Sequence, residues 1–200
     1  MIAVVNCGVG NLGSLVKALA RLGLAGELTD DPERIREARR LILPGVGAFG
    51  AVADGLHQRG ILPVLAEAVA AGTPLLGICL GMHLLFGRSA EDPQSRGLGV
   101  LPGRVERLPG GQKVPQMGWN TVRQVRPSPL FAGIPDGAYF YFVHSYYPVP
   151  QRAETVLGTT TYGLEFASVV GEGKVFGVQF HPEKSADAGL RLLKNFVELI

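Results

Sequence analysis

The first half of the chain alternates short apolar runs with helical patterns, and this alternation constrains the fold more than any other feature. Ile2–Val5, Arg40–Leu43 and Pro74–Ile78 have the length and apolar content of buried strands. Leu12–Leu19 and Ile61–Ala71 repeat apolar residues at helical spacing between them. Strands that alternate with helices predict a parallel sheet that helices cover on both faces.

The second half is dominated by strands and turns. A Gly-Glu-Gly sequence at 171–173 indicates a hairpin, and Ala186–Ile200 predicts a closing helix. We find no repeat and no linker, so we expect a single domain over residues 1–200 with a mixed, mainly parallel α/β sheet. The strands predicted here are Val100–Leu108, Trp119–Val125, Tyr139–Val149, Thr155–Tyr162, Phe166–Val170 and Lys174–Phe180.

Charge and cysteine content exclude several classes of protein. The net charge is +2, and the densest basic cluster, Arg34–Arg40, is interrupted by Glu37, so we interpret it as a solvated helix face rather than a nucleic-acid site. Two cysteines are too few for a disulfide framework. No apolar run reaches the roughly 18 residues of a membrane span, and the N-terminus lacks the pattern of a signal peptide. We therefore expect a cytoplasmic protein that binds no membrane.

Four segments that can carry chemistry follow predicted strands. They are Cys7–Gly13, Pro44–Gly47, Cys79–Met82 and His181–Glu183. In an open α/β sheet, ligands bind at the carboxyl ends of the parallel strands. The sequence thus predicts that these segments meet at one edge of the sheet.

Cys79 lies between an apolar strand and a predicted helix, Leu80–Phe86, with Gly77 and Gly81 on either side. A sharp strand-to-helix turn would expose its thiol, and the start of the helix would favour the thiolate. The alternative for any single cysteine is a small buried hydrophobic residue.

His181 directly follows a predicted strand, and Glu183 stands where it could orient the imidazole. Cysteine, histidine and carboxylate together form the set that a thiol nucleophile requires. Pro44-Gly45-Val46-Gly47 could present backbone N–H groups to an oxyanion. Ordinary turns would explain the His-Pro-Glu and Pro-Gly sequences equally well when each is taken alone.

Gly8–Gly13 matches the pattern G-x-G-x-x-G, and Asp30 and Asp31 follow near the spacing of a ribose-binding acid. A dinucleotide site is therefore a rival hypothesis, although the second half of the chain offers no further βαβ series. A zinc site from Cys79, His144, His181 and Glu183 lacks the usual ligand spacing.

The remaining histidines and aromatic residues have less specific settings. We expect His57 on the surface and His144 packed within a strand, whereas His83, one helical turn after Cys79, could face the same pocket. An aromatic surface could form from Trp119, Tyr139, Tyr141, Tyr146 and Tyr147, but we expect alternating aromatic residues in strands to pack in the core.

Together these motifs resemble the class-I (triad-type) glutamine amidotransferases over almost the whole chain. The cysteine and His-Pro-Glu motifs are typical of that class, whose fold is flavodoxin-like. Other stretches resemble one family within it, the glutaminase subunits of imidazole glycerol phosphate synthase. The stretches that carry the resemblance are Gly10–Leu12, Leu43–Phe49, Gly77–Met82, Val114–Asn120, Tyr141–Tyr147 and Gln179–Ser185.

The resemblance implies a reaction in which glutamine and water give glutamate and ammonia, with no cofactor and no metal. It implies that Cys79 attacks the amide, that His181 transfers protons and that Glu183 orients His181. It further implies that ammonia passes to a (β/α)₈-barrel cyclase subunit, which makes imidazole glycerol phosphate and an aminoimidazole carboxamide ribotide (AICAR) in histidine biosynthesis and also activates the glutaminase.

The resemblance also assigns two further groups of residues. The residues expected at the oxyanion and the glutamine are Gly45, Val46, Gly47, Leu80, His83, His144, Ser145 and Tyr146. The residues expected to face the barrel are Gly10, Asn11, Met117, Trp119, Asn120 and Lys184.

Three positions depart from the family pattern. His83 stands where Gln is usual, Gln116 where His is common, and Asn6-Cys7 where Asp-Tyr is frequent. None of them removes a member of the proposed triad. A glutaminase for another synthase, such as one making anthranilate or pyridoxal phosphate, and a catalytically silent protein of the same fold are the remaining alternatives.

Overall fold

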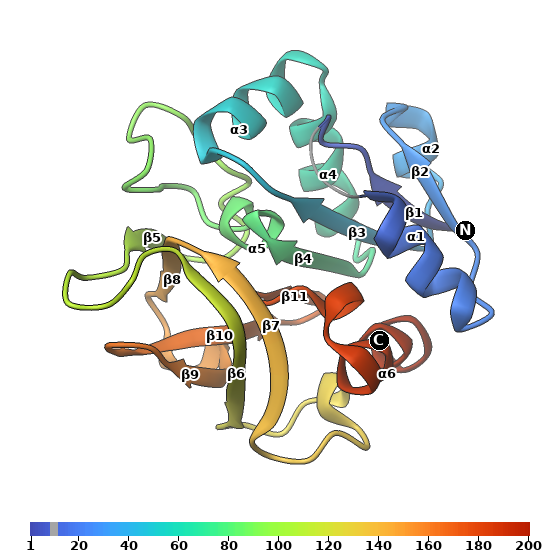
Figure 1. Cartoon of the computed structure of the whole chain (residues 1–200). Coiled ribbons are helices and arrows are strands. Elements are labelled where there is room, and N and C mark those ends of the chain that lie inside the picture. Colours follow the sequence, from blue (N-terminus) through green and yellow to red (C-terminus); the bar gives the residue numbers. More distant parts are fainter. Residues whose placement is uncertain (9–11) are drawn as a thin grey trace.

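A mixed sheet of nine strands forms the centre of the molecule in the computed structural model, which describes residues 1–8 and 12–200 (Figure 1). Its strand order is β2-β1-β3-β4-β11-β10-β9-β6-β7. The first five of these run parallel to one another, and the remaining neighbours pair antiparallel. The strands are β1 (Ile2–Val5), β2 (Gly26–Thr29), β3 (Arg40–Gly45), β4 (Leu75–Cys79), β6 (Gln116–Gln124), β7 (Ala138–His144), β9 (Val156–Thr161), β10 (Glu165–Glu172) and β11 (Val175–Val178), while β5 (Gly103–Arg107) and β8 (Tyr146–Pro150) pair separately.

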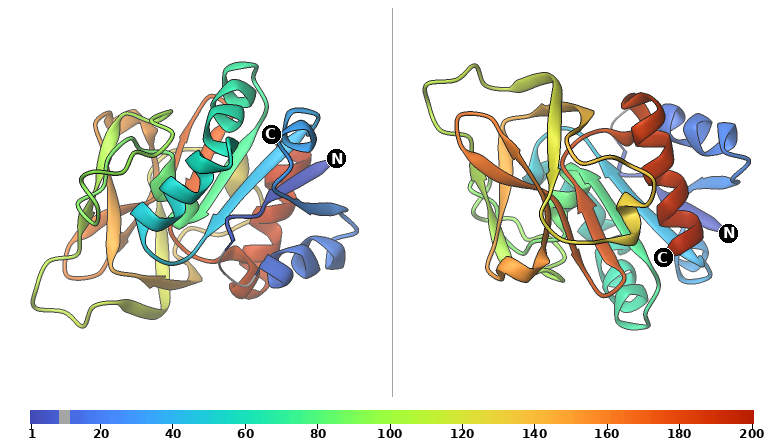
Figure 2. Two further views of the ribbon diagram at one scale, coloured as in Figure 1. Left: turned by 90° about the horizontal axis from the view of Figure 1, so that it is seen from above. Right: turned by 90° about the horizontal axis from the view of Figure 1, so that it is seen from below.

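Helices cover both faces of the parallel part, as the alternation of strands and helices predicted (Figure 2). One face packs against α1 and α6, through residues such as Leu19 and Phe196, and the other packs against α3 and α4. The α/β class with a mixed sheet is therefore confirmed. The helices are α1 (Leu12–Arg21), α2 (Pro32–Arg36), α3 (Phe49–Gln58), α4 (Ile61–Ala70), α5 (Leu80–Leu84) and α6 (Ala186–Leu199), with 3₁₀ turns η1 (Pro129–Phe131), η2 (Ala153–Thr155) and η3 (Pro182–Lys184).

The antiparallel part curls back toward the parallel part. Its last strand, β7, lies beside the end of β11, where the His181 N–H donates to the Tyr141 carbonyl at 2.9 Å. Phe140 and Phe142 on the inner face of β7 pack against Phe180, with ring centroids 4.0 and 5.6 Å apart. This curl brings residues of the second half over the carboxyl ends of the parallel strands.

Three details of the predicted elements are wrong. The stretch Tyr139–Val149 is two strands in different sheets, separated at Ser145, whose carbonyl accepts from the Leu108 N–H at 2.9 Å. Pro44-Gly45 continues β3 rather than stopping it, because both residues pair with β4. The hairpin at 171–173 exists, but β10 extends to Glu172, so the turn is made by Gly173 and Lys174.

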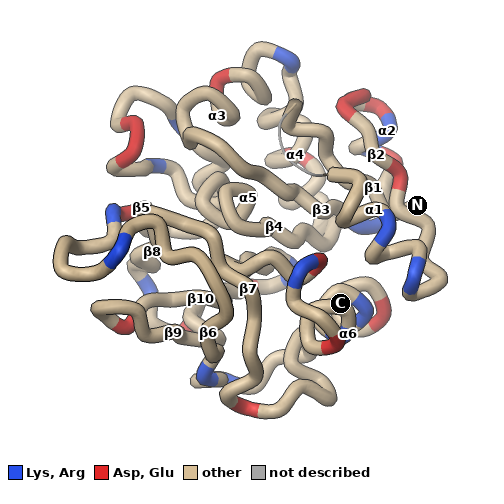
Figure 3. The backbone as a smooth tube through the Cα atoms, in the orientation of Figure 1, with Lys and Arg blue, Asp and Glu red and all other residues tan. Residues whose placement is uncertain are grey.

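Lys, Arg, Asp and Glu residues are distributed along the backbone around the molecule (Figure 3). The cluster from Arg34 to Arg40 lies on and after α2, where Arg34 pairs with Glu27 and Arg36 with Glu33. These ion pairs are exposed, as expected of a solvated helix face. None of the helices within residues 1–8 and 12–200 combines the length and the apolar content that crossing a membrane would need.

Candidate functional site

Cys79 lies at the junction of β4 and α5 in a backbone conformation that non-glycine residues rarely adopt, with φ 54° and ψ −111°. Close packing enforces this turn. A Cβ on Gly81 would overlap the Leu43 carbonyl oxygen, and one on Gly77 would lie 2.6 Å from the Gly81 oxygen. The two flanking glycines therefore let β3, β4 and α5 approach closely enough to present the thiol above the sheet.

His181 follows β11, and the η3 turn that starts at Pro182 brings Glu183 back beneath its ring. His181 Nδ1 donates to Glu183 Oε1 at 2.9 Å, and the two side chains are only 7% and 9% exposed. The second carboxylate oxygen, Oε2, is buried and has no hydrogen-bond partner among the described residues. The carboxylate thus fixes the tautomer of His181 and leaves Nε2 free for chemistry.

The Cys79 thiol and the His181 imidazole interact electrostatically. Burial lowers the pKa of His181, but the Cys79 side chain and the Glu183 carboxylate together raise that pKa to about 10. Both neighbours act by hydrogen bonding and by their negative charge. A cationic His181 between a sulfur and a carboxylate is the arrangement of an activated thiol nucleophile.

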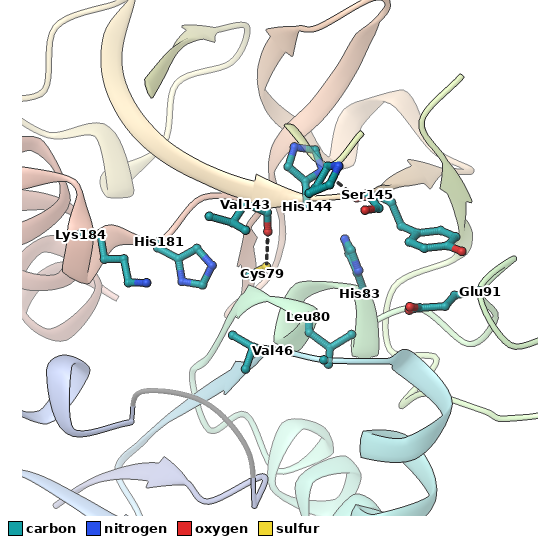
Figure 4. Close-up of a pocket in the computed structure, with 13 residues that line it drawn as sticks. Val46, Cys79, Leu80, His83, Glu91, Val143, His144, Ser145, His181 and Lys184 are labelled. Carbon is teal, nitrogen blue, oxygen red and sulfur yellow. Dashed lines mark hydrogen bonds between the residues drawn. The ribbon is translucent and has the colours of Figure 1, made fainter. Parts of the chain in front are cut away.

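A cavity of about 350 Å³ opens in front of Cys79 (Figure 4). His181 and Lys184 lie on one side of the sulfur, and His83 and Glu91 lie on the other. Its walls come from β4–α5, from the loop after β3 and from the end of β7. The residues that line it are Val46, Gly47, Cys79, Leu80, His83, Glu91, Pro115, Val143, His144, Ser145, Tyr146, His181 and Lys184.

The residues predicted at the oxyanion and the glutamine line this cavity, with the exception of Gly45. Gly45 lies behind the wall, where a Cβ would come within 3.1 Å of Leu80 and Gly81. Cys7 is buried elsewhere: its thiol donates to the Pro44 carbonyl at 3.0 Å, and burial raises its pKa to about 12. Gly10 and Asn11, and with them the middle of the Gly8–Gly13 motif, lie outside the described residues.

His144 lies in the roof of the cavity. Its Nδ1 lies 2.8 Å from the Tyr146 carbonyl, and its Nε2 lies 2.9 Å from the Gln116 side-chain amide. Burial lowers the pKa of His144 to about 4, so the ring is neutral near pH 7. The strand position of His144 agrees with the sequence, and the exposed His57 also lies where expected.

Three residues at the site were not assigned a role from the sequence. Glu91 comes from the loop after α5, and its Oε2 accepts from the Phe49 N–H at 2.9 Å. The Val143 carbonyl lies 3.6 Å from the Cys79 sulfur, and Gln179 is fully buried beside it. Within residues 1–8 and 12–200, no three His, Cys, Asp or Glu side chains are grouped closely enough to hold a metal ion.

The outer face of the β6–β7 hairpin carries large exposed side chains. Met117, Trp119 and Tyr139 are 65%, 53% and 62% exposed, so the prediction that Trp119 and Tyr139 pack in the core is wrong. Trp119 packs edge-on against Tyr141, and Lys184 Nζ lies 6.0 Å from the Tyr141 ring centre. We call Met117, Trp119, Tyr139 and Tyr141 the hairpin face; it begins next to the cavity and carries the apolar character of an interaction surface.

Known proteins resemble this chain over nearly its whole length. The family model described as glutamine amidotransferase class-I matches residues 3–199. The chain is 57% identical over its full length to imidazole glycerol phosphate synthase subunit HisH of Moorella thermoacetica, of which it covers 95%. It is 50% identical, over 98% of its length, to the subunit of that name from Geobacillus kaustophilus, of which it covers 96%.

Solved structures show the same fold. A structure described as a glutamine amidotransferase aligns with a TM-score of 0.76 at 27% identity, covering 99% of this chain and 97% of the other. PurLQS from Thermotoga maritima aligns with a TM-score of 0.78 at 19% identity, covering 99% and 97%, which is a likeness of fold alone.

Proposed function

The chain belongs to the class-I glutamine amidotransferase family, and we propose that it hydrolyses glutamine to glutamate and ammonia as a subunit of imidazole glycerol phosphate synthase in histidine biosynthesis. The observation that carries this proposal is the placement of Cys79 and His181 at the ends of two adjacent parallel strands, facing one cavity. The near end-to-end similarity to HisH subunits supports the pathway.

The proposed mechanism uses three side chains in sequence. The Cys79 thiolate attacks the side-chain amide carbon of glutamine and forms a tetrahedral intermediate. His181 then donates a proton to the leaving nitrogen, which departs as ammonia and leaves a thioester. In the second half, His181 accepts a proton from the attacking water, and glutamate leaves as the thiolate is restored. Glu183 holds the ring and stabilises its charged form throughout.

Backbone and pocket residues complete the site. We assign the oxyanion to backbone N–H groups of Val46 and Gly47, which line the cavity, and of Leu80, which follows the nucleophile. Gly47 has a φ of 100°, a conformation that suits glycine and allows such a loop to turn its N–H groups inward. The glutamine pocket is assigned to His83, His144, Ser145 and Tyr146, which line the same cavity.

The partner is a cyclase subunit with a (β/α)₈ barrel, which receives the ammonia and releases imidazole glycerol phosphate and AICAR. The hairpin face supports a docking position next to the cavity, and the residues assigned to the interface are Gly10, Asn11, Met117, Trp119, Asn120 and Lys184. We further propose that residues 1–200 form one cytoplasmic domain, since the nine-stranded sheet includes strands from both halves of the chain.

The test is glutamine turnover by the purified chain, with and without the barrel subunit. We expect turnover to rise when the barrel binds and to fall at least about a thousandfold in Cys79→Ala, because no thiolate remains to attack. The same variant complex should still make product from added ammonia, which controls for folding and assembly. Full glutamine turnover by Cys79→Ala would refute the proposed mechanism.

A further inference from the structure

The side-chain amide of Gln179 bridges Cys79 and His83 beneath the floor of the cavity. Gln179 lies just after β11 and is fully buried, and its backbone N–H donates to the Ser168 carbonyl at 2.9 Å. Its Nε2 donates to the Cys79 sulfur at 3.9 Å, and its Oε1 lies 2.8 Å from His83 Nε2. The chain His83–Gln179–Cys79 therefore ends on the reacting sulfur.

Besides His181, the sulfur has two hydrogen-bonding neighbours, and these two favour opposite protonation states. The Val143 carbonyl, 3.6 Å away, can only accept a hydrogen bond, so it favours the protonated thiol. The Gln179 amide N–H can only donate, so it favours the thiolate. A hydrogen bond to an anion is stronger than one between neutral groups. Gln179 thus opposes the effect of Val143 at the atom that must lose its proton.

An amide can serve in this way only if its nitrogen faces the sulfur. Rotation by half a turn would exchange Nε2 with Oε1 and place a carbonyl oxygen against the thiolate. His83 prevents this exchange when its Nε2 carries the ring hydrogen. It is 4% exposed, and its pKa is lowered to about 4, because burial outweighs the hydrogen bond to Gln179, so the ring is neutral near pH 7. An Nε2–H on this ring requires an acceptor, and Gln179 Oε1 is the acceptor that lies 2.8 Å away.

We propose that Gln179 is a further catalytic residue, which stabilises the Cys79 thiolate through its amide N–H, and that His83 is a positioning residue, which fixes the orientation of that amide. This inference rests on the proposed function, because it assigns a role in generating the nucleophile. It gives His83 a partner inside the protein, in addition to its place at the wall of the proposed glutamine pocket.

Other ionisable groups face the same sulfur or cavity, and they remain constant across the test. His181 interacts with the sulfur directly, and His144, Glu91, Tyr146 and Lys184 line the cavity. These groups affect the alkylation rate of Cys79 in the same way in every variant. Only changes at Gln179 or His83 should therefore alter its pH midpoint relative to the unmodified chain.

The experiment measures alkylation of Cys79 by iodoacetamide from pH 5 to 10 in the full chain, with the adduct mapped by mass spectrometry. We expect Gln179→Leu and His83→Leu to react about tenfold more slowly near pH 7, which corresponds to about 1.4 kcal/mol. In these two variants, the midpoint of the curve of alkylation rate against pH should move to higher pH. The rate on the alkaline plateau of that curve should stay the same or rise slightly. His83→Gln can again donate to Oε1 and should react within about twofold of the unmodified chain.

A purely structural role would give a different pattern. Loosening of the fold would raise the plateau rate for Cys79 and expose Cys7, which does not line the cavity and whose pKa burial raises to about 12. A higher plateau rate with alkylation of Cys7, and no change in the pH midpoint, would overturn the proposal. An unchanged dependence of the alkylation rate on pH in both leucine variants would also overturn it. If Gln179→Leu does not fold, the comparison of His83→Leu with His83→Gln still decides, and failure of His83→Gln to restore the rate would refute the positioning role.

Alkylation does not depend on glutamine, so the two proposals can fail separately. Glutamine turnover by the complex of the unmodified chain with the barrel is measured in parallel. Absence of that turnover would refute the proposed function and leave the alkylation profiles intact. Turnover with unchanged profiles in the leucine variants would refute only the roles of Gln179 and His83.

Discussion

Three histidines surround the candidate nucleophile, and their environments separate their protonation states. For His181, contact with Cys79 and Glu183 outweighs burial and raises the pKa to about 10. For His83 and His144, burial dominates and lowers the pKa to about 4. One ring is thus cationic and two are neutral near pH 7. This division fits the roles proposed above, with proton transfer for the first and fixed hydrogen bonding for the others.

The buried neutral histidines should make the fold sensitive to acid. A pKa lowered in the folded state means that the unfolded chain binds more protons, so the stability contributed by His83 is present above about pH 6.5 and is lost as the pH falls through 4. Between pH 7 and 4.5, the free energy of unfolding of the unmodified chain should fall by about 2–3 kcal/mol more than that of His83→Gln. Denaturant unfolding at both values measures this difference.

His57→Gln is the matched control, because the His57 side chain is exposed on α3. Its loss of stability on acidification should equal that of the unmodified chain. An equal loss in His83→Gln as well would show that His83 is not held neutral by burial.

At the scale of elements, the sequence predicts a strand well where both faces of it are buried. β1, β3 and β4 are continuous apolar runs for this reason. The edge strand β2 buries only Thr29, and α3 contains two glycines in ten residues, so neither carried a strong signal. Both were missed.

The same contrast holds at the site. Cys79 and His181 could be predicted because each lies at the carboxyl end of an apolar run: Cys79 is the last residue of β4, and His181 follows shortly after β11. Gln179 could not be assigned a role, since its contact with Cys79 joins residues that are 100 positions apart. Glu91 comes from a polar loop that has no periodic pattern, and its position depends on the distant start of α3.

The turn at Cys79 depends on close packing between elements, and glycine substitutions can test it. A methyl group on Gly81 would overlap the Leu43 carbonyl, so Gly81→Ala should destabilise the fold by more than about 3 kcal/mol or displace α5 and abolish turnover. Gly55→Ala is the control, because a Cβ there meets no atom within 4 Å and Gly55 lies inside α3. It should stabilise by up to about 1 kcal/mol. An equal shift of the thermal unfolding temperature in both variants would contradict the role of close packing at Gly81.

For the whole molecule, the curl of the sheet unites the two halves of the chain. The parallel strands supply Cys79 and His181, while β7 returns from the antiparallel part to place Val143 and His144 over them. The same curl turns the outer side of the β6–β7 hairpin toward solvent next to the cavity. The β6–β7 hairpin therefore borders the cavity at the end of β7 and carries the hairpin face on its outer side.

The hairpin face should carry much of the binding energy for the partner. Removing a large aromatic side chain from the centre of an interface commonly costs 2 kcal/mol or more. We therefore expect Trp119→Ala to weaken binding of the barrel subunit at least about thirtyfold in calorimetric titration. Leu28→Ala is the control, since Leu28 is 44% exposed on β2 at the opposite edge of the sheet. Equal affinities in the two variants would place the interface elsewhere.

The most direct test of the account is a covalent label on the proposed nucleophile. A glutamine-like electrophile is added to the complex of this chain with the barrel, and the modified peptide is identified by mass spectrometry. We predict one adduct, on Cys79, which excess glutamine suppresses, and none on Cys7, which does not line the cavity. No adduct on Cys79 in a complex that still hydrolyses glutamine, or an adduct on another residue that abolishes turnover, would contradict it.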